Sequence, residues 1–278
     1  ARDELANFER DPEAERYLTA TVAVRQQRRH EQKQQRQVPR PATHVPANTW
    51  VRPAWNRCRA TVVLIALSVL VTLVCLKGFK QAFDFEMRYE PVMTRLTIVP
   101  VSGFGRAGAE PWEPDIGRFI RTQTDRWKAG EPLQVPRTGV GRIIRGEAWR
   151  LVTPIFLHFS VLHILFNMLW LRELGGAIED RRGPVKYLGL VLLIAVVSNV
   201  GQYWITGQPL FGGMSGVVYG LFGYIWLKQR VEPAAGLALP PMAAFWMIGW
   251  FVLCWTGLVG PIANWAHTFG LAAGMLVG

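Results

Sequence analysis

Six long apolar segments constrain this sequence more than any other feature. They are residues 60–76, 154–171, 187–205, 216–227, 240–258 and 263–278. A helix that crosses a bilayer needs about 20 apolar residues, within a range of about 17 to 25. Half of the 278 residues are hydrophobic. The sequence therefore predicts an all-α polytopic membrane protein with six transmembrane helices, of which the fourth is short and the sixth stops at the end of the chain.

The distribution of positive charges indicates how these helices are oriented. Of the 31 lysines and arginines, 12 precede the first apolar segment, and others follow the second and fourth segments. Cytoplasmic loops of membrane proteins carry an excess of such residues. We therefore expect a multi-pass protein with a cytoplasmic N-terminus. Because the net charge of +11 is distributed in this way, we expect membrane lipids, and not nucleic acid, as partners. The basic residues before the first span either contact anionic lipid headgroups or form a solvated charge run.

The chain divides into a soluble segment and a membrane core. Residues 1–57 are polar and end in a tract rich in Gln, Arg and Pro, so we expect a short cytosolic N-terminal segment and a basic linker. Residues 58–278 form the membrane core, in which residues 77–148 are a long outer loop between the first two spans. Within this loop, residues 116–127 have the pattern of an amphipathic helix.

A glycine-rich sequence, Gly212-Gly213-Met214-Ser215-Gly216, leads into the fourth apolar segment. That segment provides roughly 18 Å of helix against a hydrocarbon core of roughly 30 Å, so Ser215 is expected below the outer surface. His267 stands near the start of the sixth segment, at a similar expected depth. Glycines at four-residue spacing on both helices allow the close approach that a Ser–His hydrogen bond needs. Because a polar pair inside a membrane is costly, we interpret Ser215 and His267 as a nucleophile and its base.

The second apolar segment contributes hydrogen-bond donors. Ser160 is a candidate N-cap, which places His163 in the first turn of the helix and Asn167 one turn later on the same face. The helix N-terminus at Ser215 offers its backbone N–H to a developing oxyanion. The six segments contain no Asp or Glu, so the sequence predicts a Ser–His dyad and not a triad. Tyr219, one turn after Ser215, is expected to pack against the imidazole.

Other interpretations of the same residues remain open. A Gly-x-Ser-Gly motif alone is more often a helix-packing motif than a nucleophile. The second, fourth and sixth segments nevertheless all carry polar residues at a similar expected depth, and this combination favours catalysis. The histidines His158, His163 and His267 suggest a metalloenzyme, but the sequence has no His-Glu-x-x-His motif, and we expect no metal and no cofactor. The short fourth segment suggests a transporter, for which we find no internal repeat.

Taken together, these stretches resemble the rhomboid intramembrane serine protease family, and within it the bacterial GlpG-type branch. The matching residues are 146–150, 158–160, 163–167 and 211–219, and Ala266 and His267 followed by Gly270 and Gly274. The resemblance implies a six-helix rhomboid-like bundle in the bacterial inner membrane that hydrolyses peptide bonds in or near the transmembrane segments of other membrane proteins. The alternative is a non-catalytic rhomboid-like protein that binds transmembrane helices. The oligomeric state is open.

The resemblance also implies roles for individual residues. Ser215 is the nucleophile and His267 the general base and acid, while His163, Asn167 and the backbone N–H of Ser215 form the oxyanion hole. The supporting residues are Gly213, Gly216, Tyr219, Trp149 and Arg150, the last two with a structural role. Substrate is expected to enter laterally between the second and fifth spans, where the gate candidates are Phe166, Phe245, Trp246 and Trp250. The outer loop is longer than the family's pattern.

Overall fold

The computed structural model describes residues 7–12, 14–15, 55–79, 85–87, 92–100, 116–131, 140–260 and 262–278. The chain divides into two compact units, residues 1–46 and 47–278. In the first unit, residues 7–10 form a helical turn. The tract rich in Gln, Arg and Pro lies outside the described residues.

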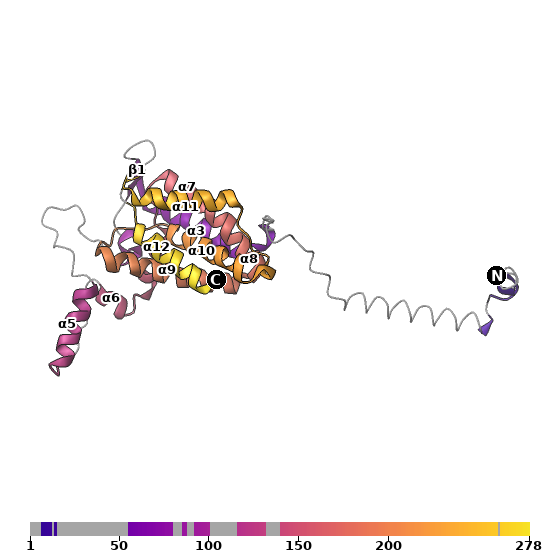
Figure 1. Cartoon of the computed structure of the whole chain (residues 1–278), viewed down its shortest axis with the longest axis horizontal. Helices are drawn as coiled ribbons and strands as arrows, with labels where there is room; N and C mark the ends of the chain where they lie inside the picture. Colours follow the sequence, from indigo (N-terminus) through magenta and orange to yellow (C-terminus); the bar gives the residue numbers. More distant parts are fainter. Residues whose placement is uncertain are drawn as a thin grey trace. The chain divides into compact units, whose positions relative to one another are not determined.

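The second unit consists mainly of helices (Figure 1). The longer helices are α3 (Arg59–Cys75), α5 (Ile116–Lys128), α7 (Val161–Trp170), α9 (Pro184–Thr206), α10 (Ser215–Val231), α11 (Pro241–Trp255) and α12 (Asn264–Val277). The shorter helical elements are η1 (Trp55–Arg57), α4 (Thr94–Leu96), α6 (Val140–Ile144), η3 (Ala148–Leu151), η4 (Thr153–Phe156), η5 (Leu171–Gly175), α8 (Gly176–Arg182) and η6 (Pro233–Ala235). Two short antiparallel strands, β1 (Leu76–Phe79) and β2 (Phe85–Met87), form a hairpin that the all-α prediction did not include. The helix expected at residues 116–127 is present as α5.

The second predicted span differs from the structure at both ends. Instead of one helix over residues 154–171, the 3-10 helix η4 comes first and α7 begins only at Val161. Ser160 caps α7, as predicted, because its hydroxyl accepts a hydrogen bond from the backbone N–H of His163 at 3.2 Å. At the other end, the helix continues through the π-helical segment η5 into α8 and stops before Gly183, whose φ is +80°.

Glu179 explains why the helix continues beyond its apolar part. It is only 2% exposed, and its carboxylate accepts hydrogen bonds from the backbone N–H groups of Ala60 and Thr61 at 2.8 and 2.7 Å. These donors belong to the first turn of α3, so the carboxylate caps that helix at the positive end of its dipole. The predicted span bounds therefore left out a buried acid. Glu179 lies about 18 Å along the helix from Asn167, and it does not join the Ser–His pair.

Helix α10 is also longer than predicted. It has 17 residues, or about 25 Å, where the apolar residues alone indicated roughly 18 Å. The helix includes two cations beyond its apolar part. Lys228 lies over the ring of Tyr224 and Arg230 over the ring of Trp226, and these contacts accommodate the charged side chains on the helix. The positive charges end the apolar stretch without ending the helix.

Two continuous helices, Val161–Arg182 and Pro184–Thr206, are long and apolar enough to cross a membrane by length and composition. Helices α3 and α11 are apolar but shorter, with 17 and 15 residues. On α3 the buried side chains are mostly small or polar, and the exposed ones are mostly aliphatic. The buried residues are Thr61, Leu64, Ser68, Thr72 and Cys75. Those exposed include Val62, Val63, Leu70 and Leu73. This inverted arrangement is typical of helices that contact one another inside a bilayer.

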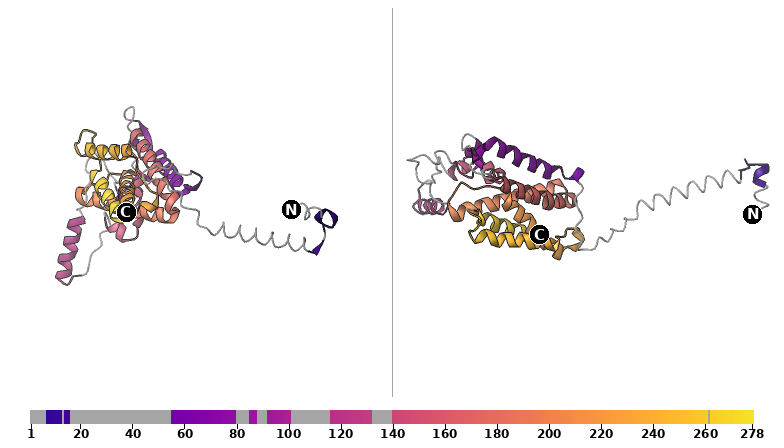
Figure 2. Two further views of the ribbon diagram at one scale, coloured as in Figure 1. Left: turned by 45° about the vertical axis from the view of Figure 1, so that its right-hand side comes forward. Right: turned by 90° about the horizontal axis from the view of Figure 1, so that it is seen from above.

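The core is built around α10, whose residues 216–225 are all buried. It packs most closely against α12, because a Cβ on Gly270 would collide with the carbonyl oxygen of Gly216, and a Cβ on Gly274 with that of Gly220. The two helices therefore touch backbone to backbone, as the glycine spacing predicts. Figures 1 and 2 show α9, α10 and α12 packed together.

Candidate active site

Ser215 and His267 form a hydrogen-bonded pair. Ser215 is the first residue of α10 and His267 lies in the first turn of α12. The serine Oγ and the histidine Nε2 are 2.8 Å apart, which is within the range for a nucleophile and its base. In the tautomer that carries its proton on Nδ1, the imidazole accepts the serine proton on Nε2. The glycine contacts between α10 and α12 are what bring these two side chains within reach.

The imidazole of His267 is held by packing. His267 is 3% exposed, and its Nδ1 is buried without a hydrogen-bond partner among the described residues. The ring of Tyr219 lies against it, with 4.8 Å between ring centroids. The Tyr219 hydroxyl in turn donates a hydrogen bond to the carbonyl of Met247 at 3.1 Å. Within the described part of the chain, the arrangement is therefore a dyad, oriented by an aromatic ring and not by a carboxylate.

Two side chains from α7 converge on the residue two positions before the serine. Gly213 has a φ of +112°, and a Cβ on it would overlap the ring of His163 and lie 3.4 Å from Nδ2 of Asn167. Asn167 is 5% exposed, and its Nδ2 has no hydrogen-bond partner among the residues described. A buried donor without a partner, close to Gly213 and two residues before the candidate nucleophile, suits the stabilisation of a developing oxyanion. The structure thus places His163 and Asn167 against Gly213, two residues before Ser215.

His158 belongs to this site in a way that sequence reasoning missed. It is completely buried, and its Nε2 accepts a hydrogen bond from the backbone N–H of Met214 at 3.4 Å. Its Nδ1 lies 3.1 Å from the carbonyl oxygen of Phe156, so Nδ1 is the donor and the ring is neutral. The loop before Ser215 is therefore fixed by a side chain. The available signal was a histidine among apolar residues just before the N-cap Ser160.

Amide side chains at the start of α12 were also missed. The side-chain carbonyl of Gln202, on α9, accepts a hydrogen bond from the backbone N–H of Ala266 at 3.0 Å. Nδ2 of Asn264 donates a hydrogen bond to the carbonyl of Cys254, on α11, at 2.9 Å. These contacts attach the first turn of α12, and with it His267, to two neighbouring helices. Uncharged amides within apolar spans were the signal in the sequence.

Trp149 and Arg150 lie away from the dyad and organise a loop. Arg150 is 1% exposed. It pairs with Glu147 at 2.5 Å and donates hydrogen bonds to the carbonyls of Thr94 and Thr97, each at 2.8 Å. Trp149 is half-exposed and donates to the carbonyl of Arg95 at 3.3 Å. Burial raises the pKa of the Glu147 carboxyl, but hydrogen bonds from Arg150 and Arg142 outweigh it and the pKa is lowered overall.

The gate candidates fall into two groups. Phe166 on α7 and Trp250 on α11 contact each other, with ring centroids 6.3 Å apart. Phe245 and Trp246 contact each other at 5.6 Å, and both are more than 60% exposed. The aromatic contact between α7 and α11 therefore consists of Phe166 and Trp250, while the other two rings cover the outer face of α11.

The described residues contain no group of three or more His, Cys, Asp or Glu side chains arranged to hold a metal ion. His158 and His163 do lie edge to face, with centroids 5.0 Å apart. The first of them is engaged with the backbone on both ring nitrogens, which leaves no free nitrogen for a metal.

Part of the chain is similar to known proteins. The rhomboid domain family model matches residues 145–278, so this part of the chain is similar to a rhomboid domain. The chain is similar to Rhomboid protease GlpG of Klebsiella pneumoniae, with 43% identity over 130 residues, which are 46% of this chain and 47% of the relative. Rhomboid protease GlpG of Salmonella paratyphi A is 42% identical over 134 residues, 48% of each chain. The protein of that name from an Enterobacter species is 42% identical over 136 residues, 49% of each chain. The chain thus matches about half the length of these curated relatives.

Proposed function

We propose that this protein is an intramembrane serine endopeptidase that hydrolyses peptide bonds in or near the transmembrane segments of other membrane proteins. The observation that carries the proposal is the 2.8 Å contact between Oγ of Ser215 and Nε2 of His267. Ser215 stands at the N-terminus of the buried helix α10, and the amide donor of Asn167 is buried without a partner; both features support a catalytic role. The rhomboid domain and the names of its relatives point to the same chemistry.

The geometry supports a two-step acyl transfer. Oγ of Ser215 attacks the carbonyl carbon of the scissile bond while Nε2 of His267 takes the hydroxyl proton. The resulting oxyanion accepts hydrogen bonds from the backbone N–H of Ser215 and from the side chains of His163 and Asn167, and one such donor is typically worth about 3 to 4 kcal/mol. His267 then protonates the leaving amine, and a water molecule activated by the same imidazole hydrolyses the acyl-enzyme.

The membrane arrangement is part of the proposal. Six spans correspond to α3, the continuous helix of α7 to α8, and α9, α10, α11 and α12. The N-terminal segment, residues 1–57, lies in the cytoplasm of a bacterial cell, and the membrane core, residues 58–278, lies in its inner membrane. Residues 77–148 form the outer loop. A substrate helix enters between α7 and α11, where Phe166 and Trp250 meet.

Labelling by a fluorophosphonate serine probe tests the assignment, together with cleavage of a transmembrane reporter substrate in lipid vesicles. We expect the wild-type protein to be labelled and active, and Ser215→Ala and His267→Ala to be neither. Ser68→Ala is a matched control, because Ser68 is also buried in a helix but donates only to the carbonyl of Leu64.

The same experiment separates the alternatives. A folded wild-type protein that is neither labelled nor active supports a non-catalytic protein that binds transmembrane helices. Activity that is lost in a chelator indicates a metalloenzyme. Labelling of Ser215→Ala at the wild-type level would place the nucleophile elsewhere.

A further inference from the structure

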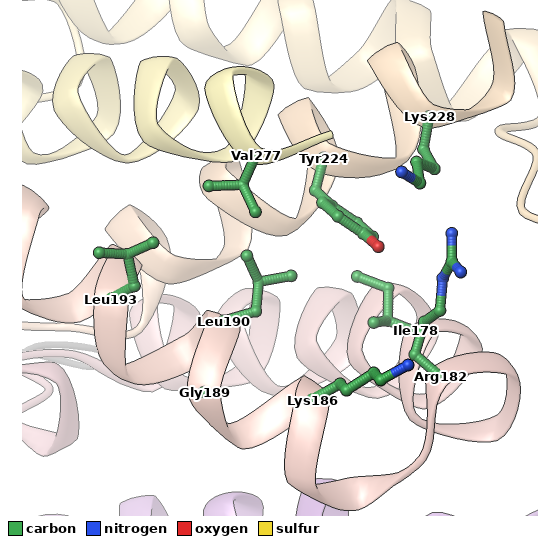
Figure 3. A pocket seen from close by; sticks show the side chains of 9 residues that line it. All are labelled: Ile178, Arg182, Lys186, Gly189, Leu190, Leu193, Tyr224, Lys228 and Val277. Atoms are coloured by element: carbon green, nitrogen blue, oxygen red, sulfur yellow. The ribbon is translucent and has the colours of Figure 1, made fainter. Parts of the chain in front are cut away.

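A pocket lies at the end of α10 opposite to Ser215. Its volume is about 320 Å³ and its walls come from α8, α9, α10 and α12 (Figure 3). Lys228, which lines it, lies about 20 Å along α10 from Ser215, so the pocket is separate from the candidate active site. Positively charged and aliphatic side chains line the pocket, and each kind indicates the chemistry of one part of a ligand.

Cations form one end of the pocket. Arg182, Lys186 and Lys228 come from three different helices, and their nitrogen atoms gather in one region of Figure 3. Arg182 and Lys228 share a single carboxylate, that of Glu232, at 3.2 and 2.9 Å. Among the residues that the structure describes, Lys186 has no ion pair, and Nε of Arg182 is buried without a hydrogen-bond partner. Three positive charges thus face one negative charge, and the excess attracts an anion.

Aliphatic side chains form the other end. Leu190, Leu193 and Val277 line the pocket away from the cations (Figure 3). Lys186, Leu190 and Leu193 lie on one face of α9, at helical spacing, and α9 is one of the two helices that can cross a membrane by length and composition. Leu193 is nearly half exposed. The wall is therefore an apolar surface that leads from the cations along a membrane-length helix.

We propose that this pocket binds an anionic phospholipid, with its phosphate between Arg182, Lys186 and Lys228 and the start of an acyl chain against Leu190, Leu193 and Val277. Basic pockets between transmembrane helices recognise such headgroups. A small soluble anion would use only the cations and would leave the aliphatic wall exposed to water. A zwitterionic lipid would fill the aliphatic wall but would not compensate the excess charge. Only an anionic lipid satisfies both ends of the pocket.

The test is native mass spectrometry of the whole chain in detergent, titrated with a phosphatidylglycerol and with a phosphatidylcholine that has the same acyl chains. We expect the wild-type protein to retain the phosphatidylglycerol more strongly. Lys186→Gln and Lys228→Gln should each weaken its binding about fivefold. Arg230→Gln is the matched control for Lys228→Gln, because it also removes one positive charge from α10. The Arg230 side chain lies over the ring of Trp226 and does not line the pocket.

A further variant tests the acyl-chain half. Nothing lies within 4 Å of a Cβ built on Gly189, which lines the pocket, so Gly189→Leu fills space without disturbing the helix. We expect it to reduce phosphatidylglycerol binding while the thermal unfolding temperature is maintained.

Three results would overturn the proposal. They are equal retention of the two lipids, an equal loss of binding in Arg230→Gln, and displacement of the lipid by millimolar inorganic phosphate. The last would define a small-anion site. Unchanged binding in Gly189→Leu would overturn the position of the acyl chain. Because binding is measured without cleavage, these outcomes are independent of the proposed peptidase activity.

Discussion

The imidazole of His158 accepts a hydrogen bond from the backbone N–H of Met214, the residue that precedes the candidate nucleophile Ser215. This contact links the loop before α7 to the N-terminus of α10, across 56 residues of sequence. It makes His158 a positioning residue, because it touches the backbone that places the serine and not the serine itself.

Replacing His158 by Phe should keep most of the ring volume but remove the acceptor for the Met214 N–H. Since a misplacement of about 1 Å can cost roughly 100-fold in rate, we expect kcat on a transmembrane substrate to fall by about that factor, with KM little changed. His158→Gln, which retains an acceptor oxygen, should recover part of the loss. An unchanged kcat in His158→Phe would show that the hydrogen bond does not position Ser215.

Gly213→Ala should abolish labelling of Ser215 by a fluorophosphonate. The new Cβ would overlap the imidazole of His163, and the φ of +112° is one that alanine rarely adopts. Gly207→Ala separates these causes, because Gly207 also has a positive φ but has open space around a Cβ. We expect Gly207→Ala to lower the unfolding temperature slightly and to keep its labelling. Equal loss in both variants would mean that backbone strain alone is responsible.

Gly270→Ala and Gly274→Ala should destabilise the fold. Each added methyl group would collide with a backbone carbonyl of α10, which cannot move aside as a side chain could, and overpacking typically costs about 1 to 3 kcal/mol. Gly249→Ala is the control, because a Cβ there meets nothing within 4 Å and alanine favours the helix by about 1 kcal/mol. Denaturant titration in mixed micelles measures the difference. If Gly274→Ala is as stable as Gly249→Ala, the two backbones are not in contact.

Glu147→Gln should destabilise the protein by about 1 to 3 kcal/mol at pH 7, because it leaves the buried guanidinium of Arg150 without its charged partner. Since the pKa of Glu147 is lowered in the folded protein, this stabilisation is fully present above the unfolded pKa, near 4.3. It is lost as the pH falls through the folded pKa. The difference in unfolding free energy between wild type and variant should therefore shrink below about pH 4. A difference that stays constant from pH 7 to pH 3 would contradict the ion pair as its cause.

Glu179→Gln should weaken the start of α3. The carboxylate accepts two backbone N–H groups and the hydroxyl of Thr61, and charged acceptors of this kind contribute about 1.5 to 3 kcal/mol each. We expect a clear fall in unfolding temperature and faster hydrogen exchange in the first turn of α3. Glu173→Gln, on the same continuous helix, is the matched control. Equal effects of the two substitutions would argue against a specific cap.

Much of the candidate site could be predicted because its signals are local. The glycines around Ser215 and after His267 indicated a close helix pair, and Ser160 indicated the start of α7. The bounds of the helices were less predictable, because apolar composition ends where charges begin. The helices do not end there: Glu179 is satisfied by another helix, and Lys228 and Arg230 lie over aromatic rings one turn earlier.

The sequence by itself determined the class of fold and the chemical character of the site, because apolar run length and four-residue spacing are properties of neighbouring residues. It indicated a serine and a histidine on two closely approaching helices and no acid to complete a triad. Only the tertiary structure decided how the site is held. His158 fixes Met214 and Gln202 fixes the start of α12, whereas the packing of Tyr219 against His267 was predicted. The first two are side-chain-to-backbone contacts between residues more than 50 positions apart, and such pairs leave no pattern in the sequence because either partner alone is an ordinary polar group.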